Sequence, residues 1–268
     1  MNAAHGAASA RHAQPQLLAG RKVLVTGIAN DQSIAYGCAK AFHAMGADLA
    51  LTYLNDKALS HVAPLAEALD AELLLPLDLR QPDALGAVFA ALSERWGVLD
   101  AALHSIAFAP KDDLHGRLVD SSAAGFAQAM DISCHSFIRM ARLAEPLMRG
   151  GGTLFTMSFQ GSTRVVDHYN LMGPVKAALE ASVRYLAHEL GPAGIRVHAI
   201  SPGPIATRAA SGLAEFDHLL ADAAARAPAH ALATIDDVGF ATAMLAADHA
   251  RLITGTTLFV DGGYHIMG

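Results

Sequence analysis

The sequence predicts an α/β fold: a doubly wound parallel sheet of about seven strands with helices on both faces. Seven short apolar runs, rich in Val, Ile, Leu and Phe, alternate with longer amphipathic stretches along the chain. The runs are mostly continuous in hydrophobicity, which is typical of parallel strands that are covered on both faces. Strict alternation of strand and helix indicates right-handed βαβ units, which wind such a sheet.

The predicted strands are apolar segments of five or six residues. They are Lys22–Thr26, Asp48–Tyr53, Glu72–Leu77, Leu99–His104, Gly152–Met157, Ile195–Ile200 and Thr256–Val260. The predicted helices between them have apolar residues at helical spacing, and are Ile34–Met45, Asp56–Leu69, Pro82–Trp96, Ala123–Met148, Asn170–Glu189 and Asp236–Leu245. One connection is much longer than the others. Pro202–Pro228 is a long insertion, and its length predicts a substrate lid over about residues 203–228.

The remaining sequence indicates a single domain. Residues 1–16 lack the apolar segment of a secretory signal and are predicted to be a disordered tail, with a transit peptide as the alternative. Residues 17–268 are predicted to form one dinucleotide-binding domain, because no linker or repeat divides them. A hydrophobic content of 53% is enough for a substantial core. No stretch reaches the ~18 apolar residues of a membrane span. We therefore expect a cytoplasmic enzyme.

Charge and metal-ligating residues exclude further classes. A sequence pI near 6.1 and a formal charge of -6 argue against a nucleic-acid binder, which would present a basic face. Cys38 and Cys134 do not have a metal-like spacing, and the 14 histidines are scattered without a helical ligand pair. We expect no metal site.

A glycine-containing loop after the first predicted strand is the candidate pyrophosphate site. It leads into a helix, whose N-terminus presents unpaired N–H groups and a partial positive charge. Gly27 lets the backbone approach a ligand closely, and the Ser33 hydroxyl can donate to a phosphate oxygen. Gly27 and Gly37 are ten residues apart, too far for the compact three-glycine fingerprint, so an ordinary βα loop is the alternative.

The ends of the second and third strands bear on the choice of dinucleotide. In a Rossmann-like sheet the second strand ends at the adenosine ribose. No arginine follows it here, and Asp56 would repel a 2′-phosphate, although Lys57 could compensate. NADH is therefore favoured over NADPH. Asp78 closes the third strand and is placed to accept from the adenine amino group, with a helix cap as the alternative.

A tyrosine and a lysine seven residues apart carry the strongest chemical signal. On one helix, Tyr169 and Lys176 would be two turns apart and project from the same face. A fixed ammonium favours the phenolate, which makes the phenol a usable proton or hydrogen-bond donor. Ketone-reducing short-chain dehydrogenases place Tyr four residues before Lys and Ser about thirteen before that Tyr. Met172 and Phe159 stand there instead, which disfavours ordinary carbonyl reduction.

With these motifs the chain resembles the NADH-dependent enoyl-acyl-carrier-protein reductases of type II fatty acid synthesis, in the short-chain dehydrogenase/reductase superfamily. The resemblance covers about residues 17–268. Besides the Tyr-x6-Lys spacing, five segments match in the family's order: Ser33–Gly37, Asn55–Lys57, His104–Pro110, Ser201–Ile205 and Val260–Gly263. It implies reduction of the trans-2 double bond of enoyl-acyl-carrier-protein thioesters by hydride transfer from NADH, in fatty acid elongation.

The resemblance also implies roles for individual residues. Tyr169 would hydrogen-bond the thioester carbonyl and stabilise the enolate, and Lys176 would hold the nicotinamide ribose. The implied contacts of NADH (NAD+) are Gly27, Ser33, Ile34, Leu54, Asp78, Leu79, Ile106, Lys176, Ile205 and Thr207. The implied acyl-binding residues are Ala109, Met172 and Phe216. The family's two long helices, here Ala123–Met148 and Asn170–Glu189, imply a homotetramer.

Departures from the family's pattern bear on the substrate. Phe159 occupies the position of a second family Tyr, as in a branch that acts on long acyl chains, so the pocket loses a hydroxyl while Tyr169 remains. The alternative function is a paralogous short-chain reductase that acts on another activated alkene or a carbonyl substrate. A dinucleotide-sensing regulator is the non-enzyme alternative, and intact Tyr169 and Lys176 argue against it.

Overall fold

The computed structural model describes residues 16–207 and 216–267 and contains one parallel sheet of seven strands. The strands are β1 (Lys22–Val25), β2 (Asp48–Tyr53), β3 (Leu73–Pro76), β4 (Ala101–His104), β5 (Gly152–Met157), β6 (Ile195–Pro202) and β7 (Thr256–Val260). Their order is β3-β2-β1-β4-β5-β6-β7. This order confirms the predicted doubly wound sheet, since it reverses direction between β1 and β4.

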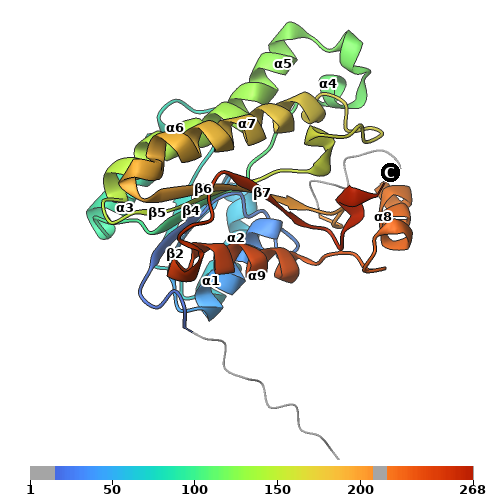
Figure 1. Cartoon of the computed structure of the whole chain (residues 1–268). Coiled ribbons are helices and arrows are strands. Elements are labelled where there is room, and N and C mark those ends of the chain that lie inside the picture. The colour runs from blue at the N-terminus through green and yellow to red at the C-terminus, as the bar shows by residue number, and fades with distance from the viewer. Residues whose placement is uncertain (1–15, 208–215, 268) are drawn as a thin grey trace, which may run out of the picture.

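Helices cover both faces of the sheet (Figure 1). One face carries α1 (Ile34–Ala44), α2 (Asp56–Ala68) and α9 (Ile235–Ala246), and the other carries α3 (Ala84–Arg95), α5 (Ala123–Met130), α6 (Ser136–Ala144) and α7 (Met172–Leu190). The buried apolar residues form a separate core on each face, as expected for continuous apolar strands. Two further helices, α4 (Lys111–His115) and α8 (Phe216–Arg226), lie outside these layers.

Close backbone packing of α1 on α9 explains a glycine of the predicted cofactor motif. A Cβ atom added at Gly37 would lie 2.1 Å from the carbonyl oxygen of Ile235. One added at Gly239 would lie 2.2 Å from the carbonyl oxygen of Gly37. Both distances are shorter than a van der Waals contact, so only glycine fits. Gly37 therefore fixes how α1 packs, and with it where the N-terminus of α1 lies.

The predicted helix Ala123–Met148 is not one regular helix. A π-helical turn at Asp131–His135 separates α5 from α6, and a 3₁₀ turn at Glu145–Leu147 follows α6. Ser136 lies directly after the π turn and its hydroxyl donates to the carbonyl of Ile132 at 2.6 Å, a side-chain bond that competes with the helical pattern. Pro146 lacks the N–H that would continue the α-helix. Apolar periodicity alone indicates neither break.

Several predictions lie wholly or partly outside the described residues. Residues 1–15 of the predicted tail and 208–215 of the predicted lid belong to this group, and so does the Phe216 side chain. The tail and the lid therefore stay predictions. Among the residues that are described, no helix is long and apolar enough to cross a bilayer.

Candidate active site

The candidate site lies at the carboxyl edge of the sheet, where the loops after β1, β4, β5 and β6 meet. In open parallel sheets, ligands bind outside the carboxyl ends of the strands, at the point where strand order reverses. Here that point is between β1 and β4. Figure 1 shows α8 at this same end of the sheet.

The loop after β1 touches the loop after β4 at Gly27. Its φ is +90°, and a Cβ added there would lie 2.0 Å from the carbonyl oxygen of Ser105. No other residue type fits this close approach of two backbones. Ile106, the next residue of the β4 loop, is half-buried and packs against the core. Gly27 and Ile106, two of the predicted cofactor contacts, thus lie side by side.

Ser33 shapes the loop that precedes α1. Its hydroxyl oxygen accepts from the N–H groups of Ala29 at 3.0 Å and Asn30 at 3.1 Å, and its proton points to Asn30 Oδ1 at 3.2 Å. In the described chain, the N–H groups of Ile34 and Ala35 at the start of α1 have no acceptor. Free first-turn N–H groups beside Gly27 fit a pyrophosphate. The residues present therefore suit a dinucleotide.

After β3, where the adenosine is predicted to bind, Asp78 pairs with a residue that sequence reasoning missed. Arg80 Nη2 lies 2.7 Å from Asp78 Oδ2, and this guanidinium holds the pKa of the Asp78 carboxyl below its usual range. The helix-cap alternative for Asp78 is wrong, because the N-cap of α3 is Asp83. Leu54 is exposed after β2, whereas Leu79 is half-buried against the core.

Lys176 lies in the second turn of α7 and is buried, with 5% of its surface exposed. Its Nζ donates to the carbonyl oxygen of Met157, the last residue of β5, at 2.7 Å. Burial lowers the pKa of Lys176 to about 8, because the apolar surroundings disfavour the ammonium. An ammonium has three donors, so two remain for a ligand.

Tyr169 does not share a helix with Lys176, which corrects the sequence prediction. The helix begins at Met172, and Tyr169 lies in a turn before it, between two residues of left-handed backbone, His168 (φ 61°) and Asn170 (φ 40°). Pro174 falls in the first turn of α7, where a missing N–H costs nothing.

The Tyr169 ring packs between Phe159 and a glycine. The two aromatic rings are 5.0 Å apart in a T-shaped arrangement. A Cβ added at Gly161 would lie 2.5 Å from the Tyr169 ring. Burial, and next the negative charge of Glu180, raise the pKa of the Tyr169 phenol. Tyr169 is therefore a neutral hydrogen-bond donor at physiological pH.

The remaining predicted residues lie on the surrounding loops and in the core. Ala109 after β4 and Ile205 after β6 are half-buried, and the Thr207 N–H donates to the Ile205 carbonyl at 2.8 Å. Met172 is buried, 6% exposed, in the core beneath α7. The ligand contacts assigned to these residues, and to Phe216, stay predictions.

Sequence reasoning also missed buried polar groups around the site. The Ser158 hydroxyl donates to Glu180 Oε1 at 2.5 Å. Ser133 bridges the N–H and carbonyl of Phe108 at 2.8 and 2.9 Å, and His104 Nε2 lies 2.7 Å from Ser136 Oγ. The sequence could have indicated these groups in one way only: each is a polar residue at a position where the apolar pattern predicts a core residue.

Three comparisons agree on what the chain resembles. The family model described as enoyl-(acyl carrier protein) reductase matches residues 27–265. The enoyl-[acyl-carrier-protein] reductase [NADH] of a Nostoc species is 46% identical over 254 residues, which are 94% of this chain and 98% of the relative. Reductase [NADH] 1 of Rhizobium meliloti is 44% identical over 252 residues, 94% and 93% of the two chains.

A solved structure shows the same likeness in three dimensions. The crystal structure of the enoyl-(acyl-carrier-protein) reductase from Anaplasma phagocytophilum in complex with NAD matches with a TM-score of 0.91 at 46% identity. The match covers 95% of this chain and 97% of the other. Among the described residues, no group of three or more His, Cys, Asp or Glu could hold a metal ion.

Proposed function

Because this chain belongs to the enoyl-(acyl carrier protein) reductase family, we propose that it acts through Tyr169 and Lys176. The protein is an NADH-dependent reductase of the trans-2 double bond in enoyl-acyl-carrier-protein thioesters, and it serves fatty acid elongation. The single observation that carries the residue assignment is the buried Lys176 ammonium on the Met157 carbonyl, in a site whose phenol is Tyr169.

The residues that would hold NADH come from both halves of the sheet. Gly27 and the free N–H groups of Ile34 and Ala35 would bind the pyrophosphate, and Lys176 would bind the nicotinamide ribose with its two remaining donors. When bound, NADH supplies the hydride that reaches the β-carbon of the enoyl thioester. The other implied contacts, such as Asp78 and Ile205, extend this path along the carboxyl edge.

Tyr169 would stabilise the charge that develops during the reaction. Addition at the β-carbon moves negative charge onto the thioester carbonyl oxygen, which becomes an enolate oxygen. The raised pKa of Tyr169 keeps its phenol protonated, so it donates a hydrogen bond to that oxygen. Protonation of the α-carbon then completes the saturated thioester.

The proposed acyl pocket is lined by Ala109, Met172 and Phe216. Phe159, whose ring is held against Tyr169, presents carbon where a second hydroxyl would stand. This contact makes the pocket more apolar, which favours a fatty acyl chain.

The test follows NADH oxidation with a crotonyl thioester, with an acetoacetyl thioester and without substrate. We expect oxidation with the crotonyl thioester alone. Oxidation with only the acetoacetyl thioester would assign the chain to carbonyl reduction instead, and NADH binding without any oxidation would support a dinucleotide sensor.

We further propose that the protein works in the cytoplasm as a homotetramer paired through α5, α6 and α7. Tyr185 of α7 is 71% exposed, and Ala177 and Ala181 on the same helix are half-buried. These residues offer an apolar surface for a second copy. Light scattering tests the assembly: a mass near the 27.9 kDa of one chain would exclude it.

A further inference from the structure

The end of β5 is bound by two successive turns of α7. The carbonyl of Met157 accepts from Lys176 Nζ at 2.7 Å, and the hydroxyl of the next residue, Ser158, donates to Glu180 Oε1 at 2.5 Å. Lys176 and Glu180 are four residues apart, so they project from the same side of the helix. The candidate catalytic lysine and a carboxylate thus share one attachment point on the sheet.

All of these polar groups are buried. Ser158 is 5% exposed and Glu180 is 6% exposed, close to the value for Lys176. A buried carboxylate with only one hydroxyl partner is costly unless a nearby positive charge compensates for it. The Lys176 ammonium is that charge, and it acts on Glu180 through space, since no hydrogen bond joins them in the described chain.

We propose that Glu180 is a positioning residue, whose carboxylate, oriented by Ser158, keeps the Lys176 ammonium charged in the working enzyme. This inference rests on the proposed function, because it connects Glu180 to the lysine that is proposed to bind NADH. Glu180 contacts neither reacting atoms nor cofactor in this scheme. It acts only through Lys176.

The directions of the pKa shifts agree with this geometry. Burial has the largest effect and lowers the pKa of Lys176, while Cys134 and then the charge of Glu180 raise it. Burial, and after it the same negative charge, raise the pKa of Tyr169. The other groups facing Lys176 are Cys134, from the π-helical turn, and His104, from β4. Burial lowers the pKa of His104 to about 3, so it is neutral and cannot replace Glu180.

The test measures NADH affinity by fluorescence quenching between about pH 6 and 9.5, which requires no turnover. In the parent protein, affinity should fall as pH rises through about 8, because Lys176 loses its charge there. Glu180→Gln keeps the shape and the bond to Ser158 but removes the charge. In this variant we expect NADH affinity to fall at a pH about one unit lower or more than in the parent protein, which is the usual effect of one nearby charge.

Glu189→Gln is the matched control, because it removes the same charge from an exposed position on the same helix. Its profile should coincide with the parent profile. If the Glu180→Gln profile also coincides with the parent profile, Glu180 has only a structural role and the inference is wrong. A parent profile that is flat around pH 8 would instead overturn the contact of Lys176 with NADH, and this inference with it.

Ser158→Ala provides a second variant if Glu180→Gln does not fold. Loss of the hydroxyl donor leaves the Glu180 carboxylate without the bond that orients it, so its negative charge acts less strongly on Lys176. The affinity profile should therefore shift in the same direction by a smaller amount. An unchanged profile in Ser158→Ala would overturn the orienting role of Ser158.

Discussion

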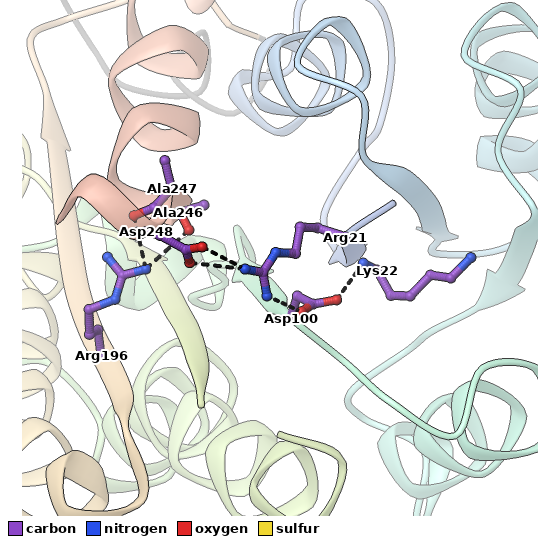
Figure 2. A network of polar contacts seen from close by, with 7 residues as sticks. All are labelled: Arg21, Lys22, Asp100, Arg196, Ala246, Ala247 and Asp248. Carbon is purple, nitrogen blue, oxygen red and sulfur yellow. Dashed lines mark hydrogen bonds and ion pairs between the residues drawn. The ribbon is translucent and has the colours of Figure 1, made fainter. Parts of the chain in front are cut away.

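The two edges of the sheet use charge in opposite ways. At the amino edge, Arg21 binds Asp100 at 2.8 Å and Asp248 at 2.9 Å, and the Asp100 carboxylate also accepts the Lys22 N–H at 2.8 Å (Figure 2). At the carboxyl edge, Lys176 and Glu180 are buried and not hydrogen-bonded to each other. The charges of this amino-edge network are paired directly, whereas the two buried charges on α7 are not.

The amino-edge network has a structural role. Arg196 of β6 donates to the carbonyls of Ala246 and Ala247 at the end of α9, where a cation also offsets the helix dipole. Together these contacts join β1, β4, β6 and the end of α9. A cavity of about 410 Å³ lies here, lined in part by Arg21 and Arg196. The guanidinium groups of both residues are already bound, by the Asp100 carboxylate and by backbone carbonyls respectively. We therefore place the chemistry at the opposite edge.

Under the proposed function, the charges that serve the reaction are the two without a direct ionic partner, Lys176 and Glu180, and not the paired charges of the amino edge. Exposed ion pairs contribute little to stability and are screened by salt. A buried charge without a direct partner costs stability and is retained where its charge state is used. Substitutions at the carboxyl edge should therefore change turnover or NADH affinity. Substitutions at the amino edge should change the free energy of unfolding.

The largest effect is expected for Tyr169→Phe. Loss of the donor at the enolate oxygen should lower turnover by about 10² to 10³-fold and leave NADH affinity unchanged. Assays with a crotonyl thioester and fluorescence titration of NADH measure the two quantities. Unchanged turnover in Tyr169→Phe would remove this residue from the mechanism.

His198 of β6 is a buried titratable side chain that has no role in the proposed reaction. Neither ring nitrogen of His198 has a partner in the described chain, the ring stacks on Phe155, and burial lowers its pKa from 6.5 to about 4. Between these values the unfolded chain binds a proton that the folded chain does not. Stability should therefore fall as pH drops from 6.5 to 4, by at most about 3 kcal/mol for this group.

His198→Phe removes this part of the acid sensitivity and keeps the stacking surface. Urea unfolding at pH 7, 5.5 and 4.5 should show a flatter dependence than in the parent protein. His188→Phe, at an exposed position, should leave the dependence as it is. Parallel curves for His198→Phe and the parent would contradict the assignment.

Lys176→Ala should affect binding as well as rate. Removing a charged donor from the ribose should weaken NADH binding by about tenfold or more. Titration of NADH by fluorescence quenching measures this change. Equal affinity in the variant and the parent would exclude the ribose contact and leave Lys176 with an electrostatic role alone.

The smallest effect is expected at the amino edge, for Asp248→Asn. The Asp248 side chain is 80% exposed, so its pair with Arg21 should contribute less than about 1 kcal/mol, and 1 M salt should remove the difference. Asp100→Asn should cost more, because Asp100 also binds backbone. Urea unfolding checks both variants, and turnover should stay unchanged in each. Lower turnover in Asp248→Asn would show that the two edges are coupled.

Local patterns in the sequence determined most of the architecture. The bounds of β2, β5 and β7 match the prediction, and the other strands differ at their ends by one to two residues. Apolar runs are local properties, and burial on both faces of a sheet requires them directly. The family's motifs in order also identified the reaction, because they are read residue by residue.

Tertiary packing decided how the site is built. His168 and Asn170 take left-handed backbone, which these residue types permit but do not require, so packing decided the turn that holds Tyr169 outside α7. Ser158 and Glu180 are 22 residues apart, and Arg21 and Asp248 are 227 apart. Such pairs form only after the strands and helices have packed, because the partner of a polar side chain depends on which distant segment is brought beside it. Hydrophobic periodicity reports which face of an element is buried, but not which polar atoms meet there.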